Sequence, residues 1–230
     1  MDLRPPLPAD FQLILASQSP RRQSLLRDIG IPFRIARSTA NEALEGVDAG
    51  TLAENNAAAK VRGVELPKDV AREAFVLGTD TVVAVEGRIL GKAPSAEVAA
   101  EMLAMLSGRT HQVVSGVALL RGAHSLQDPV VGSHQHDMLV AHAVTDVSFL
   151  PLTDVQIETY VASGEWRGKA GAYAIQGLAG VFVSGVRGEY SNVVGLPLCL
   201  LAQMFCRLGF DLLGRSWWTG DGPGGASVCQ

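Results

Sequence analysis

The sequence contains a scattered set of cationic and acidic side chains, each near the end of a predicted element. The cations are Arg21, Arg22, Lys60, Lys92 and Lys169, and the acids are Glu42 and Asp80. A triphosphate bound together with a divalent ion needs this mixture, because cations balance the phosphate oxygens while carboxylates hold the metal. Hydrolysis also needs one base that activates water. These residue types point to phosphate chemistry, but each signal is weak by itself.

The first predicted strand leads directly into a helix. Residues 13–16 are apolar, and Ser19 suits the N-cap of the helix that follows. Arg21 and Arg22 then fall in the first helical turn, where cations oppose the helix dipole. An anion held by the free backbone N–H groups, Ser17, Ser19 and both guanidinium groups would explain this placement. The alternative interpretation is a surface arginine pair that solvates the start of the helix.

The clearest strand signal covers residues 74–85, which are apolar and rich in β-branched side chains. This pattern is typical of a central strand covered on both faces. Asp80 interrupts the run, and an acid inside such a strand costs free energy unless a metal, a cation or a function compensates. In the alternative interpretation, Asp80 ends one strand and faces solvent, while residues 82–85 form another.

The rest of the chain alternates helices and strands, which predicts an α/β protein with a mixed sheet. Further strands are predicted at residues 33–36, 89–92, 110–120, 138–149 and 181–183, and helices at 52–64, 95–106, 154–163 and 195–208. Residues 121–137 form a polar excursion that contains His124, His134 and His136. We interpret it as a hairpin insertion with solvated histidines, and the alternative is a metal site at the His-x-His pair.

The composition argues against several classes of protein. With 230 residues, of which 47% are hydrophobic and 18% charged, the chain can bury a sizeable core. A net charge of −4 argues against nucleic acid as a partner. The sequence shows neither a signal peptide nor an unbroken membrane-spanning run, so we expect a cytoplasmic protein that does not bind a membrane.

Cysteine and glycine–lysine patterns argue against two further kinds of site. The three cysteines show neither metal spacing nor a disulfide framework, and the two in the last apolar helix, Cys199 and Cys206, are predicted core residues. The Gly-Lys pairs that end at Lys92 and Lys169 are one residue short of P-loop spacing, and no Ser or Thr follows them. This argues against a P-loop nucleoside triphosphatase.

Three longer segments carry a family resemblance. They are LASQSPRR at residues 15–22, GTDTVV at 78–83 and GKAGAYAIQG at 168–177. Together they resemble the three signatures of the Maf family of nucleoside triphosphate pyrophosphatases. Glu42 is similar to the family's loop glutamate and Lys60 to its helix lysine, and the segments LSGRTH at 106–111 and NVVGLP at 192–197 also match.

The resemblance implies a fold and a domain organisation. The fold would be an α/β body with an elongated, twisted mixed sheet, flanking helices and two lobes around a cleft, similar to inosine triphosphate pyrophosphatases. Residues 1–10 would be an N-terminal extension and residues 11–212 the Maf-like pyrophosphatase domain. Residues 213–230 are rich in glycine and without periodicity, which predicts a flexible tail; the alternative is that its Trp217–Trp218 pair packs on the body or on a partner. A homodimer is also implied by the resemblance.

The resemblance further implies a role for each candidate residue. Asp80 would be the proton acceptor that activates water, and with Glu42 it would place a divalent metal, Mg²⁺ or Mn²⁺. The base would be read by Arg21, Thr81 and Gln176, and Arg22 would share that task or hold phosphate. The triphosphate would be bound by Lys60, Lys92 and Lys169.

The third signature distinguishes substrates. The AYAIQ sequence at residues 172–176 resembles the branch that hydrolyses dTTP and UTP, whereas the 7-methyl-GTP branch has a version with serine and phenylalanine. The amide of Gln176 offers a donor and an acceptor, which suits the O4 and N3–H of a pyrimidine. We expect hydrolysis of dTTP, UTP and modified pyrimidine triphosphates to monophosphate and pyrophosphate. The alternatives are a 7-methyl-GTP pyrophosphatase and a non-catalytic, nucleotide-binding regulator of septum formation.

Three positions depart from the family pattern. Ala93 separates Lys92 from Pro94 where the family usually has Gly-Lys-Pro, which leaves the direction of Lys92 open. Glu189 stands where a serine is usual, and the excursion at 121–137 is longer than usual. None of the three lies within the signatures.

Overall fold

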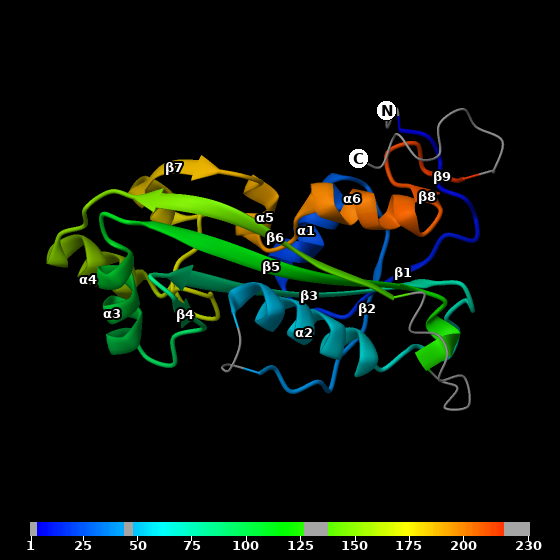
Figure 1. Ribbon diagram of the computed structural model, residues 1–230, viewed down its shortest axis with the longest axis horizontal. Coiled ribbons are helices and arrows are strands. Elements are labelled where there is room, and N and C mark those ends of the chain that lie inside the picture. The colour runs from blue at the N-terminus through cyan, green and yellow to red at the C-terminus, as the bar shows by residue number, and fades with distance from the viewer. Residues whose placement is uncertain (1–3, 44–47, 127–137, 219–230) are drawn as a thin grey trace.

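A computed structural model describes residues 4–43, 48–126 and 138–218 of the chain. It shows an elongated α/β protein in which three long strands run along the long axis (Figure 1). The strands are β1 (Leu13–Leu15), β2 (Arg34–Ile35), β3 (Phe75–Val85), β4 (Arg88–Leu90), β5 (Thr110–Arg121), β6 (Met138–Phe149), β7 (Val183–Arg187), β8 (Phe210–Asp211) and β9 (Ser216–Trp217). The α-helices are α1 (Pro20–Asp28), α2 (Ala49–Arg62), α3 (Ala96–Leu106), α4 (Asp154–Ser163), α5 (Tyr190–Val194) and α6 (Leu198–Arg207), and the 3₁₀ helices are η1 (Ala123–Leu126) and η3 (Leu178–Phe182).

The main sheet is mixed, as predicted. Its order is β2-β1-β3-β5-β6-β7, with β4 paired to β3 off this path. Strands β1 and β2 are parallel, as are β1 and β3, while the remaining pairs are antiparallel. Strand β1 pairs with the start of β3 at residues 75–77, and β4 pairs with its end at residues 83–85. On that edge, residues 78–82 of β3 therefore lie between two separate partners.

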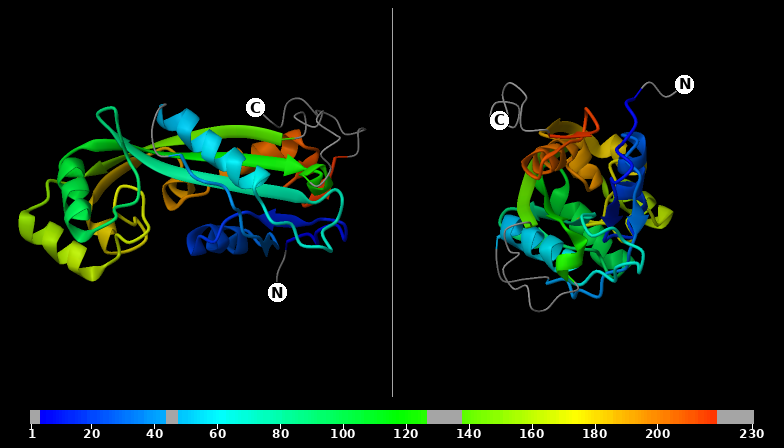
Figure 2. Two further views of the ribbon diagram at one scale, coloured as in Figure 1. Left: turned by 90° about the horizontal axis from the view of Figure 1, so that it is seen from below. Right: turned by 90° about the vertical axis from the view of Figure 1, so that its right-hand side faces the viewer.

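Helix α2 covers one face of the long strands, and α5 and α6 lie on the opposite face (Figures 1 and 2). The approach of α2 is close because glycines stand beneath it. A Cβ atom on Gly78 would lie 2.4 Å from the Ala57 carbonyl oxygen, and one on Gly116 would lie 2.2 Å from that of Ala53. No side chain larger than hydrogen fits at either position without moving the helix.

The hydrophobic core is divided along the molecule. At one end, α3 and α4 pack together over buried residues that include Val83, Leu103, Phe149 and Tyr160. At the other end, α1 and α6 cover a cluster built around the ring of Phe75. The two clusters form the two predicted lobes, and β3 passes through both. Figure 2 shows the lobes at opposite ends of the curved sheet.

Two local predictions were wrong, and one helix begins later than predicted. The segment predicted as a strand at residues 181–183 is mostly the 3₁₀ helix η3, and the strand β7 follows it. The predicted last helix at 195–208 is α6, which begins three residues later with Pro197 as its N-cap, and the short helix α5, which was not predicted, ends just before Gly195, whose φ is 123°. Cys199 is exposed and Cys206 is disulfide-bonded, so neither matches the prediction of core residues without a disulfide.

The C-terminal segment is better structured than the predicted tail. Strands β8 and β9 pair, and Trp217 stacks on Phe75 with 5.8 Å between ring centroids. The Arg215 guanidinium donates hydrogen bonds to the carbonyl oxygens of Pro5, Ile29 and Gly30. Residues 214–218 therefore belong to the body and tie the N-terminal extension to it, whereas residues 219–230 lie outside the described part.

The excursion at residues 121–137 connects β5 and β6, which are antiparallel neighbours, as the hairpin prediction requires. His124 Nδ1 lies 2.8 Å from the carbonyl oxygen of Arg72. His134 and His136 lie outside the described residues, so the two interpretations of the His-x-His pair stay predictions. Among the described residues, no group of three or more His, Cys, Asp or Glu side chains is placed to hold a metal ion.

Candidate active site

A cleft of about 880 Å³ opens beside residues 78–82 of β3, between the two lobes. Its walls come from the β1–α1 loop, the segment after β2, the end of α2, the β4–α3 loop and the 168–177 segment. Every candidate residue lines this cleft: Ser17, Ser19, Arg21, Arg22, Glu42, Lys60, Asp80, Thr81, Lys92, Lys169 and Gln176. The fold thus collects side chains from positions 17 to 176 in one place.

Asp80 is buried in the middle of one continuous strand, with only 5% of its surface exposed. The alternative of a strand-end aspartate facing solvent is therefore wrong. Lys60 Nζ lies 2.7 Å from Asp80 Oδ1 and donates a second hydrogen bond to the Thr79 carbonyl oxygen at 3.1 Å. A buried acid is tolerated here because a buried ammonium group compensates its charge.

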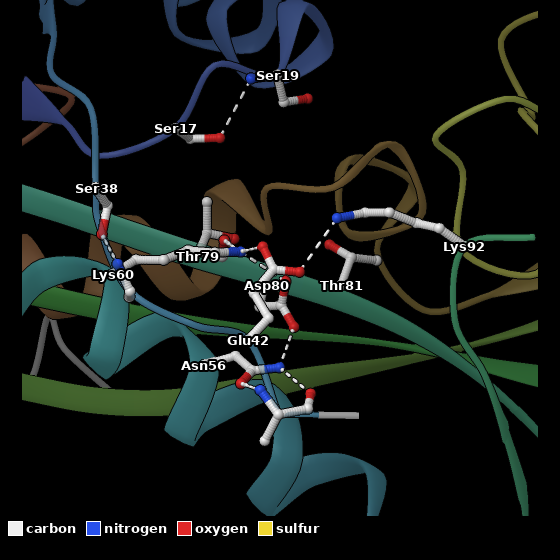
Figure 3. A network of polar contacts seen from close by, with 12 residues as sticks. Ser17, Ser19, Ser38, Glu42, Asn56, Lys60, Thr79, Asp80, Thr81 and Lys92 are labelled. Carbon is white, nitrogen blue, oxygen red and sulfur yellow. Dashed lines mark hydrogen bonds and ion pairs between the residues drawn. The ribbon is translucent and has the colours of Figure 1, made fainter. Parts of the chain in front are cut away.

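Lys60 also joins Asp80 to Glu42, whose Oε1 lies 2.9 Å from the same ammonium group (Figure 3). Glu42 Oε2 in turn accepts a hydrogen bond from Lys92 Nζ at 3.1 Å. Burial alone would raise the pKa of Glu42, but the hydrogen bonds and charges of Lys60 and Lys92 lower it to about 2. Both acids are thus held within reach of one cation. The added residue at Ala93 does not turn Lys92 away from the cleft.

A second network fixes Arg22 at the base of the cleft. Its guanidinium group donates to Ser17 Oγ at 3.1 Å, to Thr81 Oγ1 at 3.1 Å and to the Gly195 carbonyl oxygen at 2.8 Å. Burial lowers the pKa of Arg22 to about 10, against the opposing charge of Asp80. The interpretation of a solvated surface arginine pair is therefore wrong for Arg22, which ties α1 to β3 and to the turn after α5.

Two other cations face the cleft from opposite lobes. Arg21 lies on α1 and Lys169 on the 168–177 segment, and both line the cleft. Burial lowers the pKa of each, and the Arg21 charge lowers that of Lys169 further. No carboxylate in the described part of the chain forms an ion pair with either. Such a pair of like charges favours an anion between them.

The 168–177 segment is held from behind by buried aromatic side chains. The Tyr160 hydroxyl accepts a hydrogen bond from the Ala174 N–H at 3.2 Å. The Tyr173 hydroxyl lies 2.8 Å from His111 Nε2, and burial lowers the pKa of His111 to about 4. An isolated β-bridge also joins Lys92 to Ala170. These contacts set the position of Gln176, which is exposed at the cleft wall.

The sequence did not single out three polar residues that support the site. Asn56 on α2 donates a hydrogen bond to Asp80 Oδ2 at 2.9 Å, and Ser115 on β5 lies 2.9 Å from Thr81 Oγ1. Asn192 on α5 is fully buried and donates to Thr145 Oγ1 and to the Val113 carbonyl oxygen. For Asn56 a signal existed, because it precedes Lys60 by four residues and so shares its helix face.

The donor set suits a hard divalent ion. Glu42 and Asp80 offer carboxylate oxygens at the cleft, and each Asp80 oxygen has one protein donor, which leaves further lone pairs. Mg²⁺ commonly takes one or two carboxylates together with phosphate oxygens and water. The side chains present therefore fit such an ion.

Comparison with known proteins agrees with this architecture. The family model described as "Maf-like protein" matches residues 12–208. The chain belongs to the Maf family. Its relatives named dTTP/UTP pyrophosphatase include one from Symbiobacterium thermophilum, 45% identical over 87% of this chain and 96% of the relative. Another, from Moorella thermoacetica, is 44% identical over 89% and 98%, and one from an Anaeromyxobacter species is 43% identical over 94% and 95%.

Among solved structures, the Maf chain matches a dITP/XTP pyrophosphatase from Mycobacterium abscessus with a TM-score of 0.36 and 17% identity, over 60% of this chain and 74% of that one. No conclusion about the fold follows at that score, so the similarity to inosine triphosphate pyrophosphatases stays a prediction. The mixed sheet, flanking helices and two lobes are established by the structure of this Maf protein itself.

Proposed function

We propose that this protein hydrolyses dTTP and UTP, and modified pyrimidine triphosphates, at the α–β phosphoanhydride bond. The products are the nucleoside monophosphate and pyrophosphate. The observation that carries the proposal is the ammonium group of Lys60 between Asp80 and Glu42, in a cleft whose two walls carry further cations. The relatives named dTTP/UTP pyrophosphatase support the same substrates.

Asp80 acts as the base in this proposal. Each of its oxygens has one hydrogen-bond donor, so a lone pair remains to accept a proton from water. Its rigid placement by Lys60 and Asn56 fixes the direction of that lone pair. A general base of this kind contributes about 10²- to 10⁴-fold to the rate.

The cations bind the triphosphate and stabilise the leaving group. Lys60, Lys92 and Lys169 balance the charge that builds up on pyrophosphate as the bond breaks. Ser17 and Ser19, with the N–H groups at the start of α1, add donors for phosphate oxygens. Glu42 and Asp80 would hold the divalent ion, Mg²⁺ or Mn²⁺, which supplies further positive charge for these oxygens.

We assign recognition of the nucleotide's base to Gln176, Arg21 and Thr81. Gln176 presents an amide at the cleft wall, and Arg21 and Thr81 line the same cleft. A pyrimidine with O4 and N3–H matches the donor and acceptor of an amide. Arg22 is held by three protein partners, so we assign it to orient Thr81 and to contribute charge toward phosphate.

The decisive experiment measures pyrophosphate released from a panel of dTTP, UTP, CTP, GTP and 7-methyl-GTP, with Mg²⁺ and with Mn²⁺. We expect release from dTTP and UTP, and a fall of about 10²- to 10⁴-fold in kcat for Asp80→Asn with unchanged folding by circular dichroism. Preference for 7-methyl-GTP would support that alternative instead. Nucleotide binding without release from any member would support the regulator of septum formation.

Two further predictions concern assembly, which rests on the family resemblance, and location, which rests on the sequence. A homodimer is proposed, and light scattering of the purified chain tests it. A cytoplasmic location is proposed, and fractionation of cells that express the chain tests it. In the part of the chain that the structure describes, no helix has the length and apolar character to cross a membrane.

A further inference from the structure

Asn56 is a buried side chain that touches both acid-bearing parts of the cleft. It lies on α2 with 4% of its surface exposed, one turn before Lys60. Its Nδ2 donates to Asp80 Oδ2 at 2.9 Å and to the Ala43 carbonyl oxygen at 3.0 Å, and its Oδ1 accepts from the Ala43 N–H at 2.8 Å (Figure 3). Ala43 directly follows Glu42 in the chain.

These contacts leave only one orientation for the amide. Both hydrogens of Nδ2 point at oxygen acceptors, and Oδ1 faces a backbone donor. A flipped amide would place its oxygen against the carboxylate of Asp80 and the carbonyl of Ala43. The hydrogen bonds of this side chain are therefore directed at the residue after Glu42 and at Asp80.

The same pattern links two segments that no strand pairing connects in the described part of the chain. The segment containing Glu42 follows β2, whereas Asp80 lies in the middle of β3, between the stretches that pair with β1 and β4. Lys60 bridges the two acids through ion pairs. Asn56 joins the Asp80 carboxylate to the backbone beside Glu42 through hydrogen bonds of fixed direction. A lysine side chain has four flexible carbons, whereas an amide with three directed bonds does not rotate.

We propose that Asn56 is a positioning residue that fixes the carboxylate of Asp80 and the segment of Glu42 relative to each other. Both acids then face the same point in the cleft, where the proposed metal ion and the attacked phosphorus meet. The proposal rests on the proposed function for its effect on turnover. It extends that function by assigning the spacing of the two acids to a neutral side chain that touches neither substrate nor metal.

The test compares Asn56→Ala and Asn56→Asp with Asn55→Ala and Asn55→Asp. Asn55 is the exposed neighbour on the same helix, so it receives the same change without contact to the acids. For both Asn56 variants we expect kcat with UTP to fall about 10²-fold, because a displaced reacting group costs about that much. We expect KM for UTP to change by less than about threefold, since the nucleotide is bound by other side chains.

Two measurements are independent of turnover. In Asn56→Ala the backbone amide of Ala43 should exchange its hydrogen faster, as followed by mass spectrometry, because it loses its acceptor. Mn²⁺ added alone should bind about tenfold more weakly, measured by calorimetry, since a residue that orients metal ligands typically has this effect. Both Asn55 variants should match the wild type in every measurement.

The outcomes separate this proposal from the proposed function. Faster exchange at Ala43 with unchanged kcat and unchanged Mn²⁺ binding would overturn the proposal and leave Asn56 as a purely structural contact. A fall in kcat that only follows a lower melting temperature, with normal Mn²⁺ binding to the folded variant, would also overturn it. If the wild type releases no pyrophosphate, the proposed function fails, and Mn²⁺ binding alone then decides the role of Asn56.

Discussion

Asp80 on β3 lies directly opposite Gly116 on β5 in the antiparallel register. Because Gly116 has no side chain, the Ala53 carbonyl group of α2 approaches the sheet at this point. This approach brings the next two turns of α2, which carry Asn56 and Lys60, into hydrogen-bond distance of the Asp80 carboxylate. The contacts of Asp80 with Asn56 and Lys60 therefore depend on the absence of a side chain at Gly116 in the neighbouring strand.

Gly116→Ala tests that dependence. The added methyl group would lie 2.2 Å from the Ala53 carbonyl, so α2 must move outward. We expect a loss of about 1–3 kcal/mol in the free energy of unfolding and a marked fall in pyrophosphate release. Gly185→Ala on β7 is the control, because nothing among the described residues lies within 4 Å of the position its methyl group would occupy. Urea unfolding and turnover measured on both variants check the prediction, and normal activity in Gly116→Ala would contradict it.

Gln176 provides a prediction about base selection. Removing its amide in Gln176→Ala should reduce the preference for UTP over CTP by about 3- to 10-fold, which corresponds to one neutral hydrogen bond. The ratio of kcat/KM for the two nucleotides is the measurement. Gln203→Ala, on the exposed side of α6, is the matched control. An unchanged ranking of substrates in Gln176→Ala would show that the base is read elsewhere.

His111 should make stability depend on pH. Burial lowers its pKa in the folded protein to about 4, below the ordinary value of 6.5. The unfolded chain therefore binds a proton that the folded protein does not, and stability falls as pH is lowered from 6.5 toward 4. The slope from this one group is at most about 1.4 kcal/mol per pH unit.

His111→Phe isolates this contribution, because phenylalanine cannot titrate. The variant also loses the hydrogen bond to Tyr173, so it should be less stable than the wild type near neutral pH. The difference between the two should shrink as pH falls through this range, as followed by urea unfolding at several pH values. A difference that stays constant would mean that His111 is protonated in the folded protein.

Arg215 tests whether the C-terminal segment supports the body. Its guanidinium group is buried and donates to three carbonyl oxygens, two of them at the end of α1. In Arg215→Met we expect the free energy of unfolding to fall by about 2–3 kcal/mol. Arg187→Met is the control, because that side chain is 88% exposed in its ion pair with Asp146 and should contribute less than about 1 kcal/mol. Equal stability of Arg215→Met and the wild type would contradict the prediction.

Much of this site was predictable because several of its residues stand at positions where their type is normally unfavourable. Asp80 interrupts an apolar strand, and Arg21 and Arg22 oppose a helix dipole, so each indicated a compensating partner from the sequence alone. Asn56 gave no such signal, since an asparagine in an alanine-rich helix is common. Its role becomes visible only from its hydrogen bond to Asp80 on β3. Its role depends on Gly116, which lies far along the chain.

The long strands of the fold were also predictable from the sequence. Features that depend on contacts between residues far apart in the chain were not. Long strands such as β3 and β5 have a continuous apolar pattern that marks them clearly. The break between α5 and α6 depends on the left-handed turn at Gly195, whose carbonyl oxygen is held by Arg22 from the other end of the chain. Likewise, the C-terminal segment has no periodic pattern, and Trp217 is ordered there because it stacks on the ring of Phe75.

The long strand β3 has a mechanical consequence for the chemistry. It is shared by both lobes and is held by β1 at residues 75–77 and by β4 at residues 83–85. On its other edge β5 pairs with residues 75–84 without a break, and Asp80 lies near the middle of this continuous strand. The proposed base is therefore carried by backbone that both lobes share, so its position is set by the sheet and not by either lobe alone.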